Sequence, residues 1–469
     1  MQPRHLYFAV FTWLVFSGGR FTAPFLTNVA NLSDTLTSLA LSLQTMSMSL
    51  CFSIGGAVGD HLEGKYPNRG RAMTIVSALG VSTLTFLLHG VVVHLVKENS
   101  TSVFVVSCHI FLRVIYSIGL AFTYPNLDGL TVSYLVAQGR KKEDFGKERL
   151  YGAISWAISS VVLGLLIDKY GFEVLLVSAP LAFLYSFATI AIFTQHTKNT
   201  RISATANVGS PSRVEDCNSS SDANESDEEC QNNIPDTSKR YFTWLLLLSM
   251  FSTIYGAGYI ISSVTLSMGT SVVNHLIFLF FESLGSTNTM CGVTVAVTVM
   301  FEIPIFQLAP KLLEMFGPEQ LQEIACLAYI TRVVGYTFIP PNQVWMVLFL
   351  EPLHGVTYAC ARTSQVEFAA RLAPKGYESS SQGILASLTG IGASIGLFLG
   401  GWIEDTLGAK VMYRGFATVV LAGLVVLLIA GQLHRKSMES NHEEKKPLVF
   451  LDRLTKRNYS SVISTGGST

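Results

Sequence analysis

Twelve long apolar stretches divide this chain, and they constrain its fold more than any other feature. A helix needs about 20 predominantly apolar residues to cross the hydrocarbon core of a bilayer. The stretches occupy residues 6–30, 37–59, 72–96, 103–137, 150–167, 173–194, 242–283, 288–312, 321–340, 343–370, 380–403 and 411–433. Only 14% of the residues are charged, whereas a soluble protein has about a quarter. The sequence therefore predicts an all-α membrane protein with twelve transmembrane helices.

The stretches fall into two groups of six, which predicts two helical bundles. We expect an N-terminal bundle at 1–194, a linker at 195–240, a C-terminal bundle at 241–434 and a polar tail at 435–469. The linker is rich in Ser, Asn, Asp and Glu, so it lacks the apolar content to fold and should be disordered. The stretch 242–283 is too long for one straight crossing, so we expect it to be kinked or to extend beyond the bilayer.

A weak internal repeat relates the two groups. Gly164-Leu-Leu-Ile-Asp168-Lys-Tyr-Gly171 closes the fifth stretch, and Gly401-Trp-Ile-Glu-Asp405-Thr-Leu-Gly408 closes the eleventh. Two pseudo-symmetric six-helix bundles joined by a linker are typical of rocker-type transporters, whose solute site lies at the midplane between the bundles.

The distribution of lysine and arginine predicts the orientation, because these residues collect in short cytosolic loops. One side carries Arg4, Lys65, Arg69, Arg71, Arg140, Lys141, Lys142, Lys147, Lys239, Arg240, Lys311, Arg371, Lys375, Arg435 and Lys436. The other side carries Lys97, Lys169 and Lys410. We therefore expect both termini and the linker to be cytosolic. The sequence does not distinguish the plasma membrane from an internal membrane.

The sequence shows no pattern of an enzyme or of a metal site. No CxxC pair, HExxH motif, nucleophile elbow or Gly-rich phosphate loop occurs. We expect no catalytic residues, no metal and no cofactor. The expected partners are a small solute, protons and the lipid bilayer, without nucleic acid.

Charged residues nevertheless occur inside the predicted spans, where each costs about 2.5–3.5 kcal/mol or more at mid-bilayer. They are Arg20, Arg113, Asp128, Glu302, Arg332, Glu351 and His354. Because lipid-facing helices would not tolerate so many, we expect these groups to face the interior of the bundles. The alternative is structural ion pairing that locks helices together, and for Arg113 alone the two interpretations are equally balanced.

The stretch from Pro125 to Trp156 contains the predicted solute site. Tyr124 and Asp128 share one face of the fourth predicted helix, and Arg149 and Trp156 lie two turns apart on the fifth. Asp128 and Arg149 would hydrogen-bond the solute, while Trp156 would stack on a sugar or base face. The alternative for Trp156 is a packing role.

The predicted coupling site lies in the second group. Glu351 and His354 are three residues apart, so on a helix their side chains can touch. A buried glutamate opposite Arg332 can load and release a proton, because burial and a nearby cation act oppositely on its protonation. Proton coupling needs such a group.

These motifs resemble the major facilitator superfamily, in the branch that contains lactose permease and nucleoside symporters. Pro125-x-x-Asp128 followed by Phe145-Gly-x-x-Arg149-x-x-Gly-x-x-x-Trp156 is similar to the sugar-binding motif of lactose permease. The resemblance implies roles for Asp128, Arg149 and Trp156 in solute binding. It also covers both groups, and the closest likeness is to eukaryotic major facilitator superfamily domain-containing proteins of the six type.

In the second group, the resemblance implies that Glu302, Arg332, Glu351 and His354 take part in proton coupling. Lactose permease has Glu at the position of Asp128, and its histidine precedes the tenth-helix acid, whereas His354 follows Glu351.

The loop motif after the second helix is also altered. Gly56-Ala-Val-Gly-Asp60 begins it, but His61 replaces a basic residue and the remainder is stretched to Arg69-Gly-Arg71. We assign Asp60 and Arg71 to gating of the inner face.

The sequence thus predicts a secondary active transporter for a small polar solute of the sugar or nucleoside class, working by alternating access with proton symport. Two alternatives remain: an uncoupled facilitator with structural charges in the tenth helix, and a transporter-shaped receptor or scaffold that signals through 195–240 and the tail.

Overall fold

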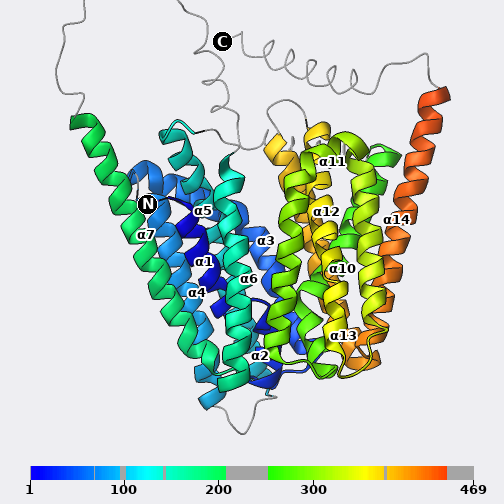
Figure 1. Cartoon of the computed structure of the whole chain (residues 1–469), viewed down its shortest axis with the longest axis horizontal. Coiled ribbons are helices and arrows are strands. Elements are labelled where there is room, and N and C mark those ends of the chain that lie inside the picture. Colours follow the sequence, from blue (N-terminus) through cyan, green and yellow to red (C-terminus); the bar gives the residue numbers. More distant parts are fainter. Residues whose placement is uncertain are drawn as a thin grey trace, which may run out of the picture.

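A computed structural model describes residues 2–67, 69–95, 102–140, 144–206, 252–373 and 378–440, and these residues form helices without strands (Figure 1). The first part of the chain forms α1 (Arg4–Phe16), η1 (Gly19–Phe21), α2 (Thr22–Asn28), α3 (Asp34–Lys65), α4 (Gly70–Leu95), α5 (Val103–Ala137), α6 (Phe145–Tyr170) and α7 (Val174–Ala206). The second part forms α10 (Ile254–Ser283), α11 (Asn288–Tyr336), η3 (Val344–Phe349), α12 (Pro352–Leu372), α13 (Glu378–Leu407) and α14 (Ala409–Ser440). Ten of the helices in the described residues are long and apolar enough to cross a membrane. The all-α membrane fold is confirmed.

The first predicted span, 6–30, is broken in its middle. Gly18 and Gly19 have φ angles of 119° and 48°, which glycine adopts without the steric cost of a side chain. The chain therefore passes from α1 through the short η1 into α2 instead of forming one helix. The break places Arg20 in η1, between the two helices.

Helix α11 contains two predicted spans, 288–312 and 321–340. Its backbone leaves the helical region at Gly317, where φ is 71°. Beyond this glycine, Glu319 accepts a hydrogen bond from Tyr255 near the start of α10, and the backbone N–H of Asn342 donates to the carbonyl of Leu284 at the end of α10 at 2.7 Å. The chain therefore reverses at Gly317 and runs alongside α10. If the two segments of α11 count as two crossings, and the path from α1 to α2 and the path from η3 to α12 count as one each, the arrangement agrees with the predicted twelve spans. The number of membrane crossings remains a prediction.

Some predicted boundaries differ from the helix ends. Helix α7 continues to Ala206, beyond the predicted start of the linker, and α14 continues to Ser440, beyond the predicted start of the tail. Residues 207–251 and 441–469 lie outside the described residues, and with them most of the predicted linker, the beginning of the predicted seventh span and most of the tail.

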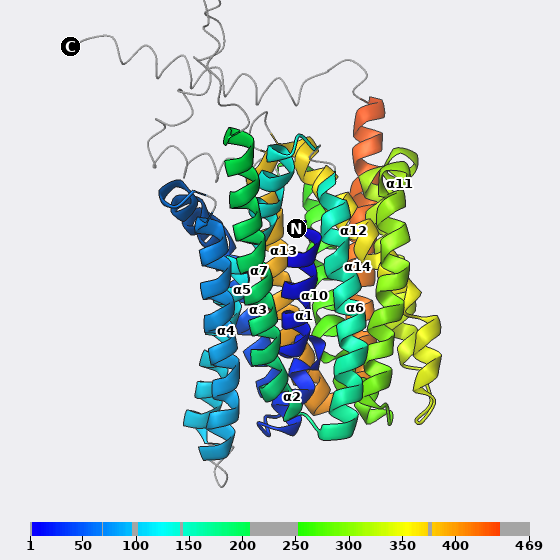
Figure 2. The same cartoon turned by 60° about the vertical axis from the view of Figure 1, so that its left-hand side comes forward.

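The two halves are joined by helix pairs that follow the internal repeat (Figures 1 and 2). In one pair, α6 lies against α11, and a Cβ atom at Gly164 would come within 2.3 Å of the carbonyl oxygen of Asn288. In the other pair, α13 lies against α3, and a Cβ atom at Gly401 would come within 2.2 Å of Cβ of Ser38. The repeat glycines allow the helices of opposite halves to approach closely.

Most polar contacts between the halves lie at one end of the molecule. Asp168 accepts from Asn288 and Thr289, Thr35 donates to Asp405 at 2.6 Å, and Asn28 donates to Glu282 at 3.3 Å. The start of α1 and the ends of α7 and α14 lie at the opposite end (Figure 1). The two halves are thus held together at the end that carries Asp168, Asp405 and Glu282. This end lies away from the start of α1 and from the ends of α7 and α14.

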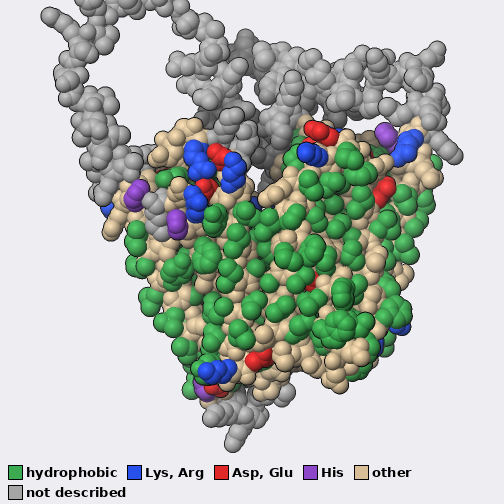
Figure 3. Space-filling view, viewed as in Figure 1, with side chains coloured by type: hydrophobic (Ala, Val, Ile, Leu, Met, Phe, Trp, Pro, Cys, Tyr) green, Lys and Arg blue, Asp and Glu red, His purple; other side chains and the backbone are tan. Residues whose placement is uncertain are grey.

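The outer surface is apolar around the middle of the molecule. Figure 3 shows one face, on which hydrophobic side chains form a broad band and charged side chains gather mainly at the two ends. Leu165 on α6 and Ile429 on α14 are 54% and 52% exposed. An apolar belt of this extent matches a lipid-facing surface.

Candidate solute-binding and coupling site

The predicted pair Asp128 and Arg149 is brought together between α5 and α6. Oδ2 of Asp128 lies 4.0 Å from Nη1 of Arg149. Tyr7 of α1, which is not among the residues predicted from the sequence, donates a hydrogen bond from its hydroxyl to Oδ1 of Asp128 at 2.6 Å. The Arg149 side chain is 55% exposed and that of Asp128 is 33% exposed. The pair therefore keeps hydrogen-bonding capacity that a solute can use.

The two predicted aromatic residues pack against the first part of the chain. The ring of Tyr124 packs edge-on against Phe11, with centroids 6.1 Å apart. Trp156 is partly buried, and its ring lies over the break in the first span, where a Cβ atom at Gly19 would be 3.4 Å from the indole. Trp156 therefore packs against the break at η1 and retains a partly exposed side chain.

Glu351 lies in a buried polar cluster of the second half. Its Oε2 accepts from Nη2 of Arg332 at 2.9 Å and from the hydroxyl of Thr298 at 2.6 Å. Its Oε1 accepts from the hydroxyl of Tyr336 at 2.7 Å. Arg332 and Glu351 are each 1% exposed. A carboxylate so enclosed is satisfied only while these donors remain in place.

The predicted tenth span is not one helix, which changes how Glu351 and His354 are presented. The chain forms η3 and then α12, with Glu351 at the N-cap and Pro352 in the first turn, where its missing N–H costs nothing. The expected contact between the Glu351 and His354 side chains is absent from the hydrogen bonds of the described residues. Both bind Arg332 instead, whose Nη1 lies 2.5 Å from Nδ1 of His354.

Arg20 connects this cluster to the first half. Its Nη2 donates to Oδ1 of Asn274 in α10 at 3.2 Å and lies 3.5 Å from Nε2 of His354 in α12. The sequence identifies Arg20 as an intramembrane charge but does not indicate its role. The Gly18-Gly19 pair before it was the local signal for a break that presents this side chain.

Glu302 lies on α11 near the middle of its first segment. Its carboxylate is partly exposed and experiences the charges of Arg20 and Arg149, both from the first half. The backbone of α12 approaches closely here, since a Cβ atom at Gly355 would be 2.8 Å from the nitrogen of Glu302. Glu302 is therefore separate from the hydrogen-bonded cluster around Glu351, and arginines of the first half act on its charge.

The predicted gating residues also meet. Oδ1 of Asp60 accepts from Nη2 and Nε of Arg71 at 2.7 and 3.2 Å. Nη1 of Arg71 donates to the carbonyl of Gly129 at 2.9 Å and to the hydroxyl of Ser133 at 2.6 Å. The pair joins the ends of α3, α4 and α5 within the first half.

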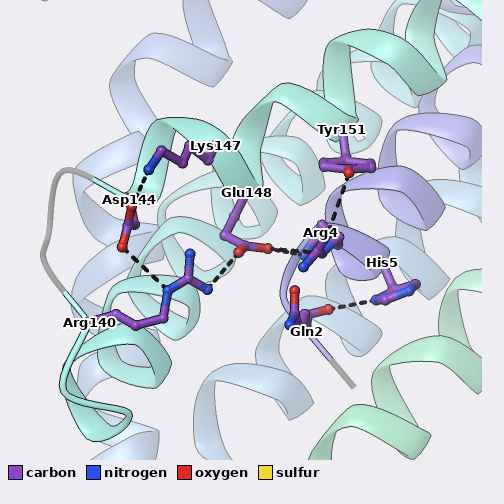
Figure 4. A network of polar contacts seen from close by, with 8 residues as sticks. All are labelled: Gln2, Arg4, His5, Arg140, Asp144, Lys147, Glu148 and Tyr151. Atoms are coloured by element: carbon purple, nitrogen blue, oxygen red, sulfur yellow. Dashed lines mark hydrogen bonds and ion pairs between the residues drawn. The ribbon is translucent and has the colours of Figure 1, made fainter.

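A second network, which the sequence did not reveal, lies at the same end of the first half (Figure 4). Glu148 is 3% exposed and accepts from Nη1 of Arg140 at 2.8 Å and from the backbone nitrogen of Arg4 at 2.9 Å. Asp144 accepts from Lys147 at 2.8 Å, and this hydrogen bond holds the pKa of the Asp144 carboxyl below its usual value. The network fixes the start of α1 against the hairpin between α5 and α6. Lys141 and Lys142 lie outside the described residues.

Among the described residues, no group of three or more His, Cys, Asp or Glu side chains is arranged to hold a metal ion. The sites above therefore consist of hydrogen-bonding and ion-pairing groups distributed over both halves.

Paired helical bundles with charged side chains facing the space between them define a membrane transporter of the major facilitator type. The chain belongs to the MFS_1 like family, whose model matches residues 67–415. Its relatives are transporters, so the chain is not an enzyme.

Two relatives illustrate the similarity. The chain is 23% identical to the maltose permease of Geobacillus stearothermophilus over 332 residues, which cover 70% of this chain and 73% of the permease. It is 24% identical over 164 residues to the major facilitator superfamily domain-containing protein 6-like protein A of Xenopus laevis, covering 34% of this chain and 26% of that protein.

Solved structures share the fold at low sequence identity. The nucleoside transporter NupG superposes with a TM-score of 0.65 at 14% identity, covering 91% of this chain and 98% of NupG. A D-xylose–proton symporter superposes with a TM-score of 0.57 at 16% identity, covering 90% of this chain and 95% of the symporter.

Proposed function

We propose that this protein is a secondary active transporter that moves a small polar solute of the sugar or nucleoside class by alternating access, in symport with protons. The observation that carries the proposal is the pair of Asp128 and Arg149, held 4.0 Å apart with the arginine side chain 55% exposed. Charged residues inside a membrane are costly, and where they occur they commonly mark a solute or ion pathway. Relatives named for maltose, nucleosides and D-xylose support the solute class.

In this proposal, the solute binds at the first half. Asp128 and Arg149 hydrogen-bond its hydroxyl groups, Tyr7 orients the Asp128 carboxylate, and the partly exposed ring of Trp156 offers a stacking surface. Tyr124 contributes the aromatic wall beside Phe11.

The proton site lies in the second half. Glu351 gains or loses a proton within the enclosure of Arg332, Thr298 and Tyr336, and each change of charge alters which of these donors it holds. Arg332 transmits the change to His354, which it contacts directly. Glu302, facing the charges of Arg20 and Arg149, links proton occupancy to the side that binds solute.

Alternating access needs two arrangements of the halves, and the described contacts fit one of them. The halves are tied together at the end that carries Asp168 and Asp405, while Asp60 and Arg71 form contacts within the first half at the other end. With both termini cytosolic, as the lysine and arginine distribution predicts, this state opens toward the cytosol. The predicted division into two bundles, a cytosolic linker and a tail belongs to the same proposal.

The test is solute-dependent proton flux in proteoliposomes, screened over sugars and nucleosides. Arg149→Ala is compared with the parent and with Arg371→Ala, which removes an exposed arginine paired with Glu367 at the end of α12. We expect a solute that moves protons in the parent and in Arg371→Ala but not in Arg149→Ala. Equal flux in all three proteins would contradict the assigned site.

Two other outcomes redirect the proposal. Solute movement without protons would identify an uncoupled facilitator. No solute-dependent flux from folded protein across the panel would contradict the assigned solute class.

A further inference from the structure

Arg20 is a cation shared between the halves, and it has no carboxylate partner in the part of the chain that the structure describes. It comes from η1 of the first half, and its Nη2 reaches Asn274 and His354 of the second half. Among the described residues, no carboxylate oxygen is paired with its guanidinium within 4.0 Å. Asn274 supplies only a neutral oxygen.

His354 does not satisfy Arg20 either. Arg332 can only donate, so the short contact between its Nη1 and Nδ1 of His354 requires a lone pair on Nδ1. A neutral imidazole has one lone pair and one N–H, so the hydrogen of His354 is on Nε2. Nε2–H and Nη2 of Arg20 are therefore two donors that face each other 3.5 Å apart.

A second cation without an acid lies nearby. Arg113 is 2% exposed, and its Nε and Nη2 donate to the neutral Oε1 of Gln44 at 2.9 and 2.5 Å, while its Nη1 has no partner among the described residues. Both Arg113 and Arg20 act electrostatically on His275 of α10. A buried cation without a counterion is costly, so such groups are normally compensated by an anion.

The acidic residues facing these arginines are too few to compensate them. Asp128 lies beside Arg149, and Glu351 is paired with Arg332. Glu351 also acts electrostatically on Arg20, and Glu302 acts on Arg20 and Arg149. Three carboxylates, those of Asp128, Glu302 and Glu351, therefore stand against the four guanidinium groups of Arg20, Arg113, Arg149 and Arg332. The described part of the space between the halves thus carries an excess of positive charge.

We propose that the transported solute carries an anionic group, a carboxylate or a phosphate, which binds between the Arg20 guanidinium and Nε2–H of His354. This inference rests on the proposed transport function and specifies its solute class. An anionic oxygen accepts from both donors, and the planar guanidinium suits either oxyanion. Arg113 adds attraction without direct contact. Because the two donors come from opposite halves, the anion also ties the halves together when it binds.

The test measures binding separately from transport. Purified protein is unfolded thermally with matched pairs of compounds, glucuronate against glucose and uridine monophosphate against uridine, with acetate and inorganic phosphate as free anions. We expect saturable stabilisation by the anionic member of at least one pair. Comparing stabilisation by glucuronate and acetate with stabilisation by uridine monophosphate and inorganic phosphate distinguishes a carboxylate from a phosphate.

Variants assign the binding site. Arg20→Gln should weaken the anion-dependent stabilisation at least tenfold, Arg20→Lys less, and Arg113→Gln should weaken it as well. Arg414→Gln is the control, because it removes an exposed arginine that contacts Thr337 and Phe338 and, among the described contacts, neither Arg20 nor His354. Retained helical content and a monodisperse elution profile exclude misfolding.

Several outcomes would overturn the inference. These are stabilisation by the neutral member of a pair equal to that by its anionic partner, equal anion binding in Arg20→Gln and the parent, or no stabilisation by any anion. If any of these results is found and a neutral solute still shows flux that depends on Arg149, the anion inference is wrong and the proposed transport function is retained. Arg20-dependent anion binding without flux of any solute would support the site and contradict transport.

Discussion

Oδ2 of Asp168, at the end of α6, accepts hydrogen bonds from the backbone nitrogen of Thr289 at 2.8 Å and from its hydroxyl at 2.5 Å. Oδ1 of the same carboxylate accepts from the backbone nitrogen of Asn288 at 2.8 Å. The acidic residue of the internal repeat therefore binds the exposed N–H groups at the start of α11, where a negative charge is favourable. One half of the molecule caps a helix of the other.

Asp168→Ala should weaken the contact between the halves at the end of the molecule where Asp168 and Asp405 lie. Hydrogen bonds to a charged group contribute about 1.5 kcal/mol or more, so the ratio of conformers should shift by roughly tenfold. Spin labels at Lys169 and Ser283 should then report a larger population of long distances. Asp144→Ala, at the opposite end of α6, serves as the control. An unchanged distance distribution in Asp168→Ala would show that the cap does not hold this state.

Gly164→Ala and Gly401→Ala should each oppose closure of the same end. The added methyl group would lie 2.3 Å from the carbonyl oxygen of Asn288 in the first variant and 2.2 Å from Cβ of Ser38 in the second. The same spin-label distances should therefore lengthen in both variants. Gly383→Ala on α13 meets nothing within 4 Å and should leave the distances unchanged. If the spin-label distances are the same in all three variants, close packing at Gly164 and Gly401 does not determine how closely the two halves approach at this end.

Glu351→Gln should remove proton coupling while solute exchange persists, because the amide keeps the shape of the side chain and cannot exchange a proton at neutral pH. The measurement is solute uptake with and without a proton gradient. Tyr336→Phe is the matched variant, since it removes the 2.7 Å hydrogen bond and leaves the carboxyl group in place. It should retain coupling. Gradient-driven accumulation by Glu351→Gln would place the proton site elsewhere.

Tyr7→Phe should weaken solute binding moderately. The tyrosine hydroxyl donates to Asp128 at 2.6 Å, and losing a hydrogen bond to a charged group costs about 1.5–3 kcal/mol. We expect KM to rise roughly tenfold or more, with a smaller change in the maximal rate. Tyr151→Phe, which loses only a 3.4 Å contact with Arg4, should behave like the parent. Equal KM values in both variants would argue that Asp128 is not oriented by Tyr7.

Glu148→Gln should lower the stability of the first half. Glu148 is 3% exposed and holds Arg140 and the backbone of Arg4, so its loss should cost about 1–3 kcal/mol. Thermal unfolding in detergent should show a lower midpoint. Lys147→Gln removes a partner whose side chain is 78% exposed and should change stability by less than about 1 kcal/mol. A larger effect of Lys147→Gln would reverse the expected ranking.

Residue spacing in the sequence predicted contacts between residues on helices that follow each other directly in the chain. Asp60 and Arg71 flank one connection between helices, and Asp128 and Arg149 flank another, so each pair meets once its two helices pack as neighbours. The repeat at Asp168 and Asp405 could also be seen in the sequence. Its role could not, because the partners of these residues, Thr289 and Thr35, belong to the opposite half.

Contacts between distant segments were the ones missed. Tyr7 reaches Asp128 across 121 positions, and Arg20 reaches His354 across 334. No local pattern encodes such distances. The span predicted at 343–370 corresponds to Val344–Leu372, but it is divided near Glu351 into η3 and α12. Pro352 was a visible sign that a new helix begins there.

The sequence by itself determined the membrane class, the helical architecture and the identity of the intramembrane charges, because apolar length and the cost of burying charge act locally along the chain. Only the tertiary structure decided which residues from distant segments meet. Tyr7 came to donate to Asp128, and Arg20 lies between the halves, where it contacts Asn274 and His354 and forms no ion pair with the described acids. The physical reason is that ion pairing depends on distances of a few ångströms, which the packing of helices sets and the order of residues does not.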